Sequence, residues 1–268
     1  MRKTHPYQYH ERNLDEFETV DFRKIGEEVR RFFRFSNEKD VLTDRIVRII
    51  EPKKPYSILD VGCGEGYVIR KICRQVKHCI ALDPDPKMLE ILGKHVKNKC
   101  KVEIVNKKLE DFETTKKFDV VLSSHTFSFF DNKRHAIDKL LNWTKKGGRL
   151  ILVLHREASE QLQMLKEVFL AIHGREINHI YAETLQTYFA RRGFDPKVEE
   201  VETVARFPSF EILLGLSYFL FRTDYDTTSG QNKHLIRTYL QRKSNNHYNE
   251  IRTLHGIITV RNGCGPFR

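Results

Sequence analysis

Ile58-Leu59-Asp60-Val61-Gly62-Cys63-Gly64-Glu65-Gly66 is the stretch that decides the fold. It consists of an apolar strand that runs directly into a glycine-rich turn, and an amphipathic helical pattern follows. Where a parallel strand ends in glycines, the backbone can approach a bound ligand closely. The glycines alternate here, unlike the GxGxxG spacing of sites that admit a pyrophosphate. The turn therefore favours a ligand that presents an uncharged ribose and an amino-acid portion.

A second apolar segment ends in a carboxylate not far along the chain. It runs from His78 to Asp83. A carboxylate at the end of a neighbouring strand has two oxygen atoms and can accept hydrogen bonds from both hydroxyls of a ribose. We therefore include Asp83 and the following Pro84 in the predicted ligand site.

From Ser57 onward, short apolar segments alternate with longer amphipathic ones, which is typical of a largely parallel sheet with crossover helices. The predicted strands are 57–61, 78–83, 101–106, 118–123 and 148–155. The predicted helices are 66–76, 86–97, 132–145, 158–173 and 182–192. Two further β-like segments are 197–206 and 256–261.

About fifty residues separate these last two segments, far more than a hairpin needs, so we expect structure of its own between them. Its aromatic-rich part, 210–221, fits either a cap over a substrate site or a helical excursion on the sheet edge. Before the first strand, Asn37 is suited to cap a helix. The predicted parts are an N-terminal arm and helical lid (1–50), a ligand-binding core (51–206), a helical cap insertion (207–255), and a last strand with the C-terminal tail (256–268).

Composition restricts the class of protein. The chain has 268 residues, of which 40% are hydrophobic and 31% charged, as in an ordinary folded protein. No apolar run approaches the roughly 20 residues that would span a bilayer. The N-terminus turns polar and acidic where a secretory peptide needs an apolar centre. These features predict a soluble, cytoplasmic protein.

Cysteines and net charge add two expectations. The five cysteines are odd in number and lack the Cys/His spacing of zinc sites, which predicts reduced intracellular thiols and no metal site. The formal net charge of +11 is compatible with RNA or a phospholipid surface as partner. Acidic residues lie between the basic pairs, so an ordinary solvated basic surface is the simpler interpretation.

Five motifs occur in a fixed order along the chain. They are DVGCGEG (60–66), ALDPD (81–85), LEDF (109–112), FDVVLSSHTFSFF (118–130) and KKGGRLILVL (145–154). Together they resemble the motif series of class I S-adenosylmethionine-dependent methyltransferases, over roughly residues 55–155. The resemblance implies an α/β, Rossmann-like doubly wound sheet, mostly parallel with an antiparallel last strand, and S-adenosyl-L-methionine as cofactor.

The same resemblance implies roles for individual residues. The glycines would line the methionine and ribose, Asp60 would orient the turn or meet the methionine amine, and Asp83 would hold the ribose. Glu110 would lie near the adenine, and the end of the fourth strand would face the methyl group. The implied cofactor residues are Asp60, Gly62, Cys63, Gly64, Gly66, Asp83, Pro84, Leu109, Glu110, Ser123, Ser124 and His125. For His125, backbone contact with the cofactor and a role as base both stay open.

A second resemblance concerns Val29–Glu38, which is similar to the lid of histamine N-methyltransferase and its relatives. In that family a glutamate grips the amine-bearing substrate, and the matching position is Glu38. An acidic residue in a first helical turn also favours the helix dipole without any substrate. The candidate catalytic residues are therefore Glu38 and His125. The glycine turn departs from that family, so the substrate cannot be inherited.

Motifs for several acceptor classes are missing. The chain has no Asn-Pro-Pro-Tyr or Asp-Pro-Pro-Tyr run for amino groups of bases, no Pro-Cys pair for pyrimidine carbon, and no metal-carboxylate set for catechols. We predict methyl transfer to a small molecule, possibly an amine, with nitrogen preferred over oxygen. The alternatives are an RNA or ribosome methyltransferase, a quinone or lipid methyltransferase, and a non-catalytic binding protein. The oligomeric state does not follow from the sequence.

Overall fold

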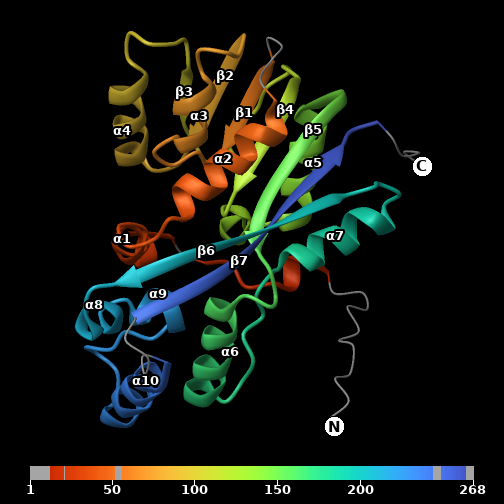
Figure 1. The fold of residues 1–268 in the computed structure, drawn as a ribbon. Coiled ribbons are helices and arrows are strands. Elements are labelled where there is room, and N and C mark those ends of the chain that lie inside the picture. Colours follow the sequence, from red (N-terminus) through yellow and green to blue (C-terminus); the bar gives the residue numbers. More distant parts are fainter. Residues whose placement is uncertain (1–12, 21, 52–55, 244–248, 264–268) are drawn as a thin grey trace.

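The computed structural model describes residues 13–20, 22–51, 56–243 and 249–263. A single sheet organises them, with strand order β3-β2-β1-β4-β5-β7-β6 (Figure 1). The strands are β1 (Ser57–Val61), β2 (His78–Asp83), β3 (Glu103–Asn106), β4 (Phe118–Ser124), β5 (Thr144–His155), β6 (Lys197–Phe207) and β7 (Asn249–Arg261). The first five pair in parallel, while β7 is antiparallel to both β5 and β6. The predicted doubly wound sheet with an antiparallel last strand is confirmed.

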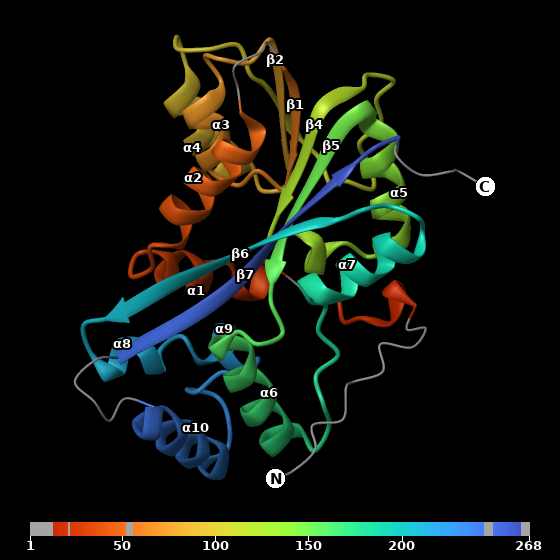
Figure 2. The same ribbon diagram turned by 45° about the vertical axis from the view of Figure 1, so that its right-hand side comes forward.

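Helices cover both faces of the sheet. They are α1 (Phe22–Phe33), α2 (Glu38–Ile50), α3 (Tyr67–Ile72), α4 (Pro86–Val96), α5 (Lys133–Trp143), α6 (Glu160–His173), α7 (Ala182–Arg191), α8 (Phe210–Leu214), α9 (Ser217–Phe221) and α10 (Gly230–Lys243). Figure 2 shows α2, α3 and α4 on one face and α5 and α7 on the other. The predicted helix 66–76 is shorter in the structure, since α3 ends at Ile72.

The strand order reverses between β1 and β4. After β1 the chain adds β2 and β3 on one side, and after β3 it crosses to β4 on the other side of β1. In open α/β sheets, ligands bind at the carboxyl ends of the strands where this reversal occurs. The reversal brings the glycine turn after β1 next to the end of β4, because Asp60 pairs with both Ala81 and Leu122.

The start of α2 differs from the predicted cap. The side chain of Asn37 forms no capping hydrogen bond. Its Oδ1 instead accepts a hydrogen bond from the backbone N–H of Val204 in β6 at 2.8 Å, and Ser36 Oγ accepts one from the N–H of Glu38 at 3.1 Å. The helix begins beside β6, so tertiary pairing takes the Asn37 side chain. This contact fixes Glu38 relative to the sheet.

Strands β6 and β7 form a long antiparallel pair that projects beyond the other strands (Figure 1). They pair from Lys197–Thr259 to Phe207–Asn249. The prediction that the last strand begins at 256 is therefore wrong by seven residues, from 249 to 255. Most residues from 249 to 255 are polar, and Thr253 and His255 are buried all the same, so the sequence resembles a loop while the backbone pairs with β6.

The segment 210–221 lies in a second apolar core at the end of this strand pair. Its buried side chains pack with those of α1, α6 and α10. They are Leu213, Leu214, Leu216, Leu220 and Phe221. This apolar run is thus largely internal. Within the described residues, we find no helix that combines the length and the apolar character needed to cross a membrane.

Two cysteines form a disulfide, contrary to the prediction of reduced thiols. Cys73 follows α3 and Cys100 precedes β3, and their Cα atoms are 5.8 Å apart. Helix α4 lies between them in sequence and brings them together in one small apolar cluster. Cys63 and Cys79 are free thiols, and Cys264 lies outside the described residues.

Candidate active site

The three glycines of the turn all have left-handed backbone angles. The φ values of Gly62, Gly64 and Gly66 are +70°, +54° and +72°. A Cβ atom at Gly62 would lie 2.0 Å from Thr126 Cγ2, and one at Gly66 would lie 2.4 Å from a methyl carbon of Leu92. A Cβ atom at Gly64 would meet no atom within 4 Å. The turn is therefore packed at its two ends and open in the middle, where a ligand can approach.

Asp83 holds this turn against β2. Its Oδ2 accepts a hydrogen bond from the N–H of Gly64, and its Oδ1 accepts one from the N–H of Asp85, both at 2.8 Å. Burial raises the pKa of Asp83 above its ordinary value. Each carboxylate oxygen has a second lone pair that can accept from a ligand hydroxyl. Cys63 is half-buried inside the turn, and Pro84 is exposed after β2.

Asp60 and Lys39 place opposite charges at the same edge of the sheet. Asp60 is almost fully buried, and burial, followed by the nearby Asp83, raises the pKa of its carboxyl to about 7. The Lys39 Nζ lies 4.0 Å from the ring centre of Phe33. Burial lowers the Lys39 pKa, and Glu38, Glu65 and Asp60 oppose this effect, in that order. Lys39 was not among the predicted residues. A zwitterionic group could bind between it and Asp60.

The turn after β3 holds Leu109 and Glu110. Leu109 is buried in the main core. Glu110 is connected to the region of α5, because its Oε1 accepts from the N–H of Asp131 at 3.4 Å and its backbone oxygen accepts from Lys139 Nζ at 2.9 Å. Its position near an adenine stays a prediction.

The end of β4 is tied to the glycine turn. Ser123 is buried, and its hydroxyl shares a hydrogen bond with that of Thr126. The Thr126 hydroxyl also donates to the backbone oxygen of Val61 at 3.3 Å. Ser124 is half-buried beside them. Thr126 was missed by sequence reasoning, although its place three residues after the predicted strand end indicated it.

His125 has an unusual backbone conformation for a residue other than glycine. Its φ is +56°, and its N–H donates to Val153 of β5 at 2.9 Å. Such strained residues persist where the surrounding structure holds them, often at functional sites. This turn directs the imidazole towards two further histidines, His155 at the end of β5 and His255 in β7.

The two predicted catalytic residues meet in this cluster. Glu38 Oε1 lies 3.6 Å from His125 Nε2, and Glu38 Oε2 lies 3.8 Å from His255 Nε2. The atoms His125 Nε2 and His255 Nδ1 are 3.1 Å apart. Helix α2, β4 and β7 therefore bring together three residues that lie far apart in the sequence.

Burial controls the charges of the cluster. It raises the pKa of Glu38 to about 7, against a smaller opposite effect of Lys39. It lowers the His125 pKa well below the usual range, and the neighbouring histidines lower it further. Burial, together with the Arg222 guanidinium, lowers the pKa of His155 to about 4. The imidazoles are therefore neutral at pH 7, with lone pairs available for a proton or a cation.

Sequence reasoning missed four further polar residues at this edge. His155 ends a predicted strand next to β4, so its position beside His125 could have been inferred from the strand ends. His255 lay just before the predicted last strand, and only the longer β7 places it opposite His155. His179 stacks on His155 with ring centres 6.4 Å apart. Arg222 comes from the end of α9, which no local pattern indicated.

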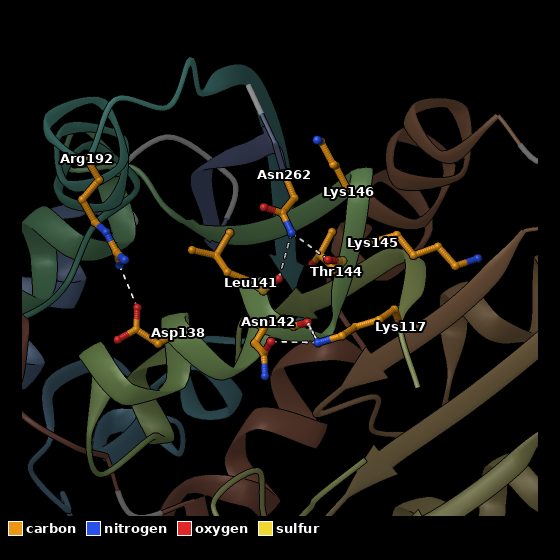
Figure 3. Close-up of a pocket in the computed structure, with 9 residues that line it drawn as sticks. All are labelled: Lys117, Asp138, Leu141, Asn142, Thr144, Lys145, Lys146, Arg192 and Asn262. Atoms are coloured by element: carbon orange, nitrogen blue, oxygen red, sulfur yellow. Dashed lines mark hydrogen bonds and ion pairs between the residues drawn. The ribbon is translucent and has the colours of Figure 1, made fainter. Parts of the chain in front are cut away.

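A surface hollow of about 510 Å³ lies at the opposite edge of the sheet (Figure 3). It is lined by Lys117, Asp138, Leu141, Asn142, Thr144, Lys145, Lys146, Arg192 and Asn262. Several of its polar side chains bind one another or the backbone: Arg192 pairs with Asp138 at 2.8 Å, and Asn262 Nδ2 donates to the Thr144 oxygen at 2.6 Å. These bonds fasten the ends of α5 and β7, and the hollow contains none of the predicted site residues.

Known proteins are similar to this chain over its core. A malonyl-[acyl-carrier protein] O-methyltransferase of Halalkalibacterium halodurans is 25% identical over 122 residues, which cover 41% of this chain and 45% of that protein. A tRNA U34 carboxymethyltransferase of Glaesserella parasuis is 29% identical over 117 residues, covering 42% and 37%. The similarity thus spans less than half of the length of either relative.

A solved structure extends the similarity to most of the fold. The plantazolicin methyltransferase BpumL, in complex with SAH, superposes with a TM-score of 0.51 at 19% sequence identity, covering 90% of both chains. The family described as methyltransferase domain matches residues 25–199, which include α2, the glycine turn, Asp83, His125 and His155. With the strand order and the antiparallel β7, this match shows that the chain belongs to the class I S-adenosylmethionine-dependent methyltransferases.

Proposed function

We propose that the protein transfers a methyl group from S-adenosyl-L-methionine to a small-molecule acceptor, with a nitrogen atom preferred over oxygen. The observation that carries this proposal is the buried Glu38 carboxylate beside His125, at the strand end adjoining the open glycine turn. The cofactor would supply an activated methyl group at that edge, and the cluster would meet the acceptor.

The cofactor site we propose uses both charged and neutral groups. Asp83, already bonded to the turn through Gly64, would accept hydrogen bonds from the ribose. Asp60 and Lys39 would bind the ammonium and carboxylate of the methionine portion, because these charges are complementary. The open space at Gly64 would allow the ligand to contact the backbone.

Methyl transfer needs little beyond alignment of the acceptor with the methyl group of the cofactor. The bound cofactor would supply its sulfonium methyl group: the lone pair of the acceptor would form the new bond to the methyl carbon, and the electron pair of the S–CH₃ bond would stay on sulfur. An acceptor N–H or O–H then loses its proton. Proximity and orientation can provide much of the rate acceleration. Glu38 can take this proton, because burial raises the pKa of its carboxyl to about 7.

Two observations support nitrogen over oxygen. Glu38 is 3% exposed, and its two contacts with histidines are longer than hydrogen bonds. A buried carboxylate in such a place is stabilised by a cation, which a protonated amine would provide before it loses its proton. A phenol or alcohol lacks this charge.

Isothermal titration with S-adenosylmethionine and S-adenosylhomocysteine tests the cofactor site. Incubation with labelled cofactor and matched panels of amines and phenols, followed by mass spectrometry of the products, then tests the acceptor. We expect micromolar cofactor binding and a mass gain of one methyl group on amines. Absence of cofactor binding would contradict the activity, whereas methylated phenols alone would contradict only the preference for nitrogen.

RNA is a second candidate acceptor. It is favoured by the net charge of +11 and by the similarity to a tRNA U34 carboxymethyltransferase. Binding of bulk tRNA should then weaken steeply with salt, because neutralised phosphates release counterions. Weak, salt-independent binding would leave the small-molecule proposal in place.

The cytoplasmic location expected from the sequence stays a prediction. The disulfide between Cys73 and Cys100 argues against it, because the cytosol keeps most thiols reduced. Thiol counting on the endogenous protein, trapped with an alkylating reagent at lysis, would decide the question.

A further inference from the structure

The geometry points to a divalent transition-metal centre in which His125, His155 and His255 are the three nitrogen ligands. One ligand atom from each histidine lies within 4.8 Å of those of the other two. Nothing in the local sequence suggested the site, because its ligands are 30 to 130 positions apart. The sequence-based expectation of no metal considered only closely spaced ligands.

The distances agree with a shared ion. Four ligands at about 2.1 Å from a tetrahedral ion are separated from one another by about 3.4 Å. His125 Nε2 lies 3.1 Å from His255 Nδ1. The ring centre of His155 lies 4.7 Å from that of His125 and 5.3 Å from that of His255, so the three imidazoles are mutual neighbours.

The backbone holds the three ligands on or just after three neighbouring strands. His155 and His255 are directly paired residues of β5 and β7, so their side chains are on the same face. His125 reaches them through its left-handed turn after β4. Glu38, the first residue of α2, is 3% exposed and places a carboxylate 3.6 Å from His125 and 3.8 Å from His255.

A second layer orients one ligand. The Nε2 atom of His255 lies 2.7 Å from the hydroxyl of Thr203 in β6, and both side chains are buried. With Nε2 bonded to this hydroxyl, Nδ1 is left facing His125. Metal-bound histidines in proteins generally have such a partner on the second nitrogen, which fixes the tautomer and the ring orientation. Thr203 is thus a positioning residue.

The ligand chemistry selects the class of metal. Three imidazoles suit Zn²⁺ and its first-row neighbours, whereas Mg²⁺ and Ca²⁺ prefer oxygen ligands. The charge of the Glu38 carboxylate also offsets part of the ion's charge in this buried place. The centre deepens the proposed function, because it lies on the acceptor side of the site. Its role in catalysis rests on that function, but the binding of the ion does not.

The test is metal binding by the full-length protein. After treatment with chelator and its removal, the protein is titrated with ZnCl₂ and, separately, with CoCl₂. We expect one Zn²⁺ per chain by elemental analysis, a Zn²⁺-dependent rise in Tm, and the visible d–d bands of four-coordinate Co²⁺. Cofactor titration with and without Zn²⁺ is measured in parallel, so that a failed metal site and a failed methyltransferase are distinguished.

Variants separate a real centre from general histidine binding. His155→Asn should weaken Zn²⁺ binding by at least roughly 100-fold, and Thr203→Val by about 10- to 100-fold, as for outer-layer partners of other sites. His179→Asn, which removes the ring stacked on His155 but no ligand, should leave it unchanged. Circular dichroism checks that each variant folds. No stoichiometric binding by the wild type, or equal binding by His155→Asn and His179→Asn, would overturn the inference.

Discussion

The glycine turn and the histidine cluster are neighbours at one edge of the sheet, yet they form in different ways. The turn leads from β1 into α3, and its partners Asp83 and Leu92 follow within about thirty residues, whereas Thr126 comes from the end of β4. The cluster needs α2, β4, β5 and β7, and its residues extend from Glu38 to His255. Mostly local order therefore determines the turn, and long-range pairing determines the cluster.

The largest effect is expected where the turn is most tightly packed. Gly62→Ala adds a Cβ that collides with Thr126 in a left-handed backbone. We expect a loss of roughly 3 kcal/mol in the free energy of unfolding, from strain and overpacking together, measured by urea denaturation. Gly147→Ala is the matched control, with φ +76° and no atom within 4 Å of the added Cβ. Equal losses in both variants would show that packing against Thr126 contributes nothing.

The second largest effect, on cofactor affinity, is expected at Asp83. Asp83→Asn removes a charged acceptor of two backbone hydrogen bonds, and we expect cofactor affinity to fall about 100-fold, since charged hydrogen bonds contribute about 1.5 to 3 kcal/mol each. Isothermal titration measures the loss. Asp138→Asn, at the opposite edge, should keep the wild-type affinity. If both variants bind the cofactor normally, the turn is not its site.

Asp60 should make cofactor binding depend on pH. Its pKa in the free protein is about 7, so protonation of this buried carboxyl stabilises the fold at low pH, and this contribution is lost as the pH rises through 7. The ionised form is the one that attracts the cofactor ammonium. Affinity should therefore rise about 10-fold from pH 6 to pH 8. A similar rise in Asp60→Asn would assign the titration to another group.

The smallest effect is expected at the entry of α2. Asn37→Ala removes the hydrogen bond from Val204 and should lower the free energy of unfolding by about 1 kcal/mol. Asn37→Asp keeps an acceptor oxygen there and should retain most of the stability. Urea denaturation of both variants compares them. No difference between them would mean that this contact does not hold Glu38 over the cluster.

The sequence predicted the core of the fold because periodicity and turn chemistry are local. The strands around the glycine turn were predicted at or near their observed bounds, and Glu38 and His125 were singled out before they were known to meet. The start of β7 was predicted too late, because half of its residues are polar and only pairing with β6 makes them a strand. The disulfide was missed because two distant cysteines have no spacing rule.

By itself, the sequence determined the family, the parallel core and the ligand turn, since each depends on residues close together along the chain. The tertiary structure alone decided that His155 and His255 lie opposite each other, that Thr203 orients one of them, and that Arg222 reaches the same edge. These relations come from the antiparallel pairing of β7 with β5 and β6, and from the helices at the end of β6 and β7. Strand register and helix packing over long separations are set by burial of the whole core, which no single segment encodes.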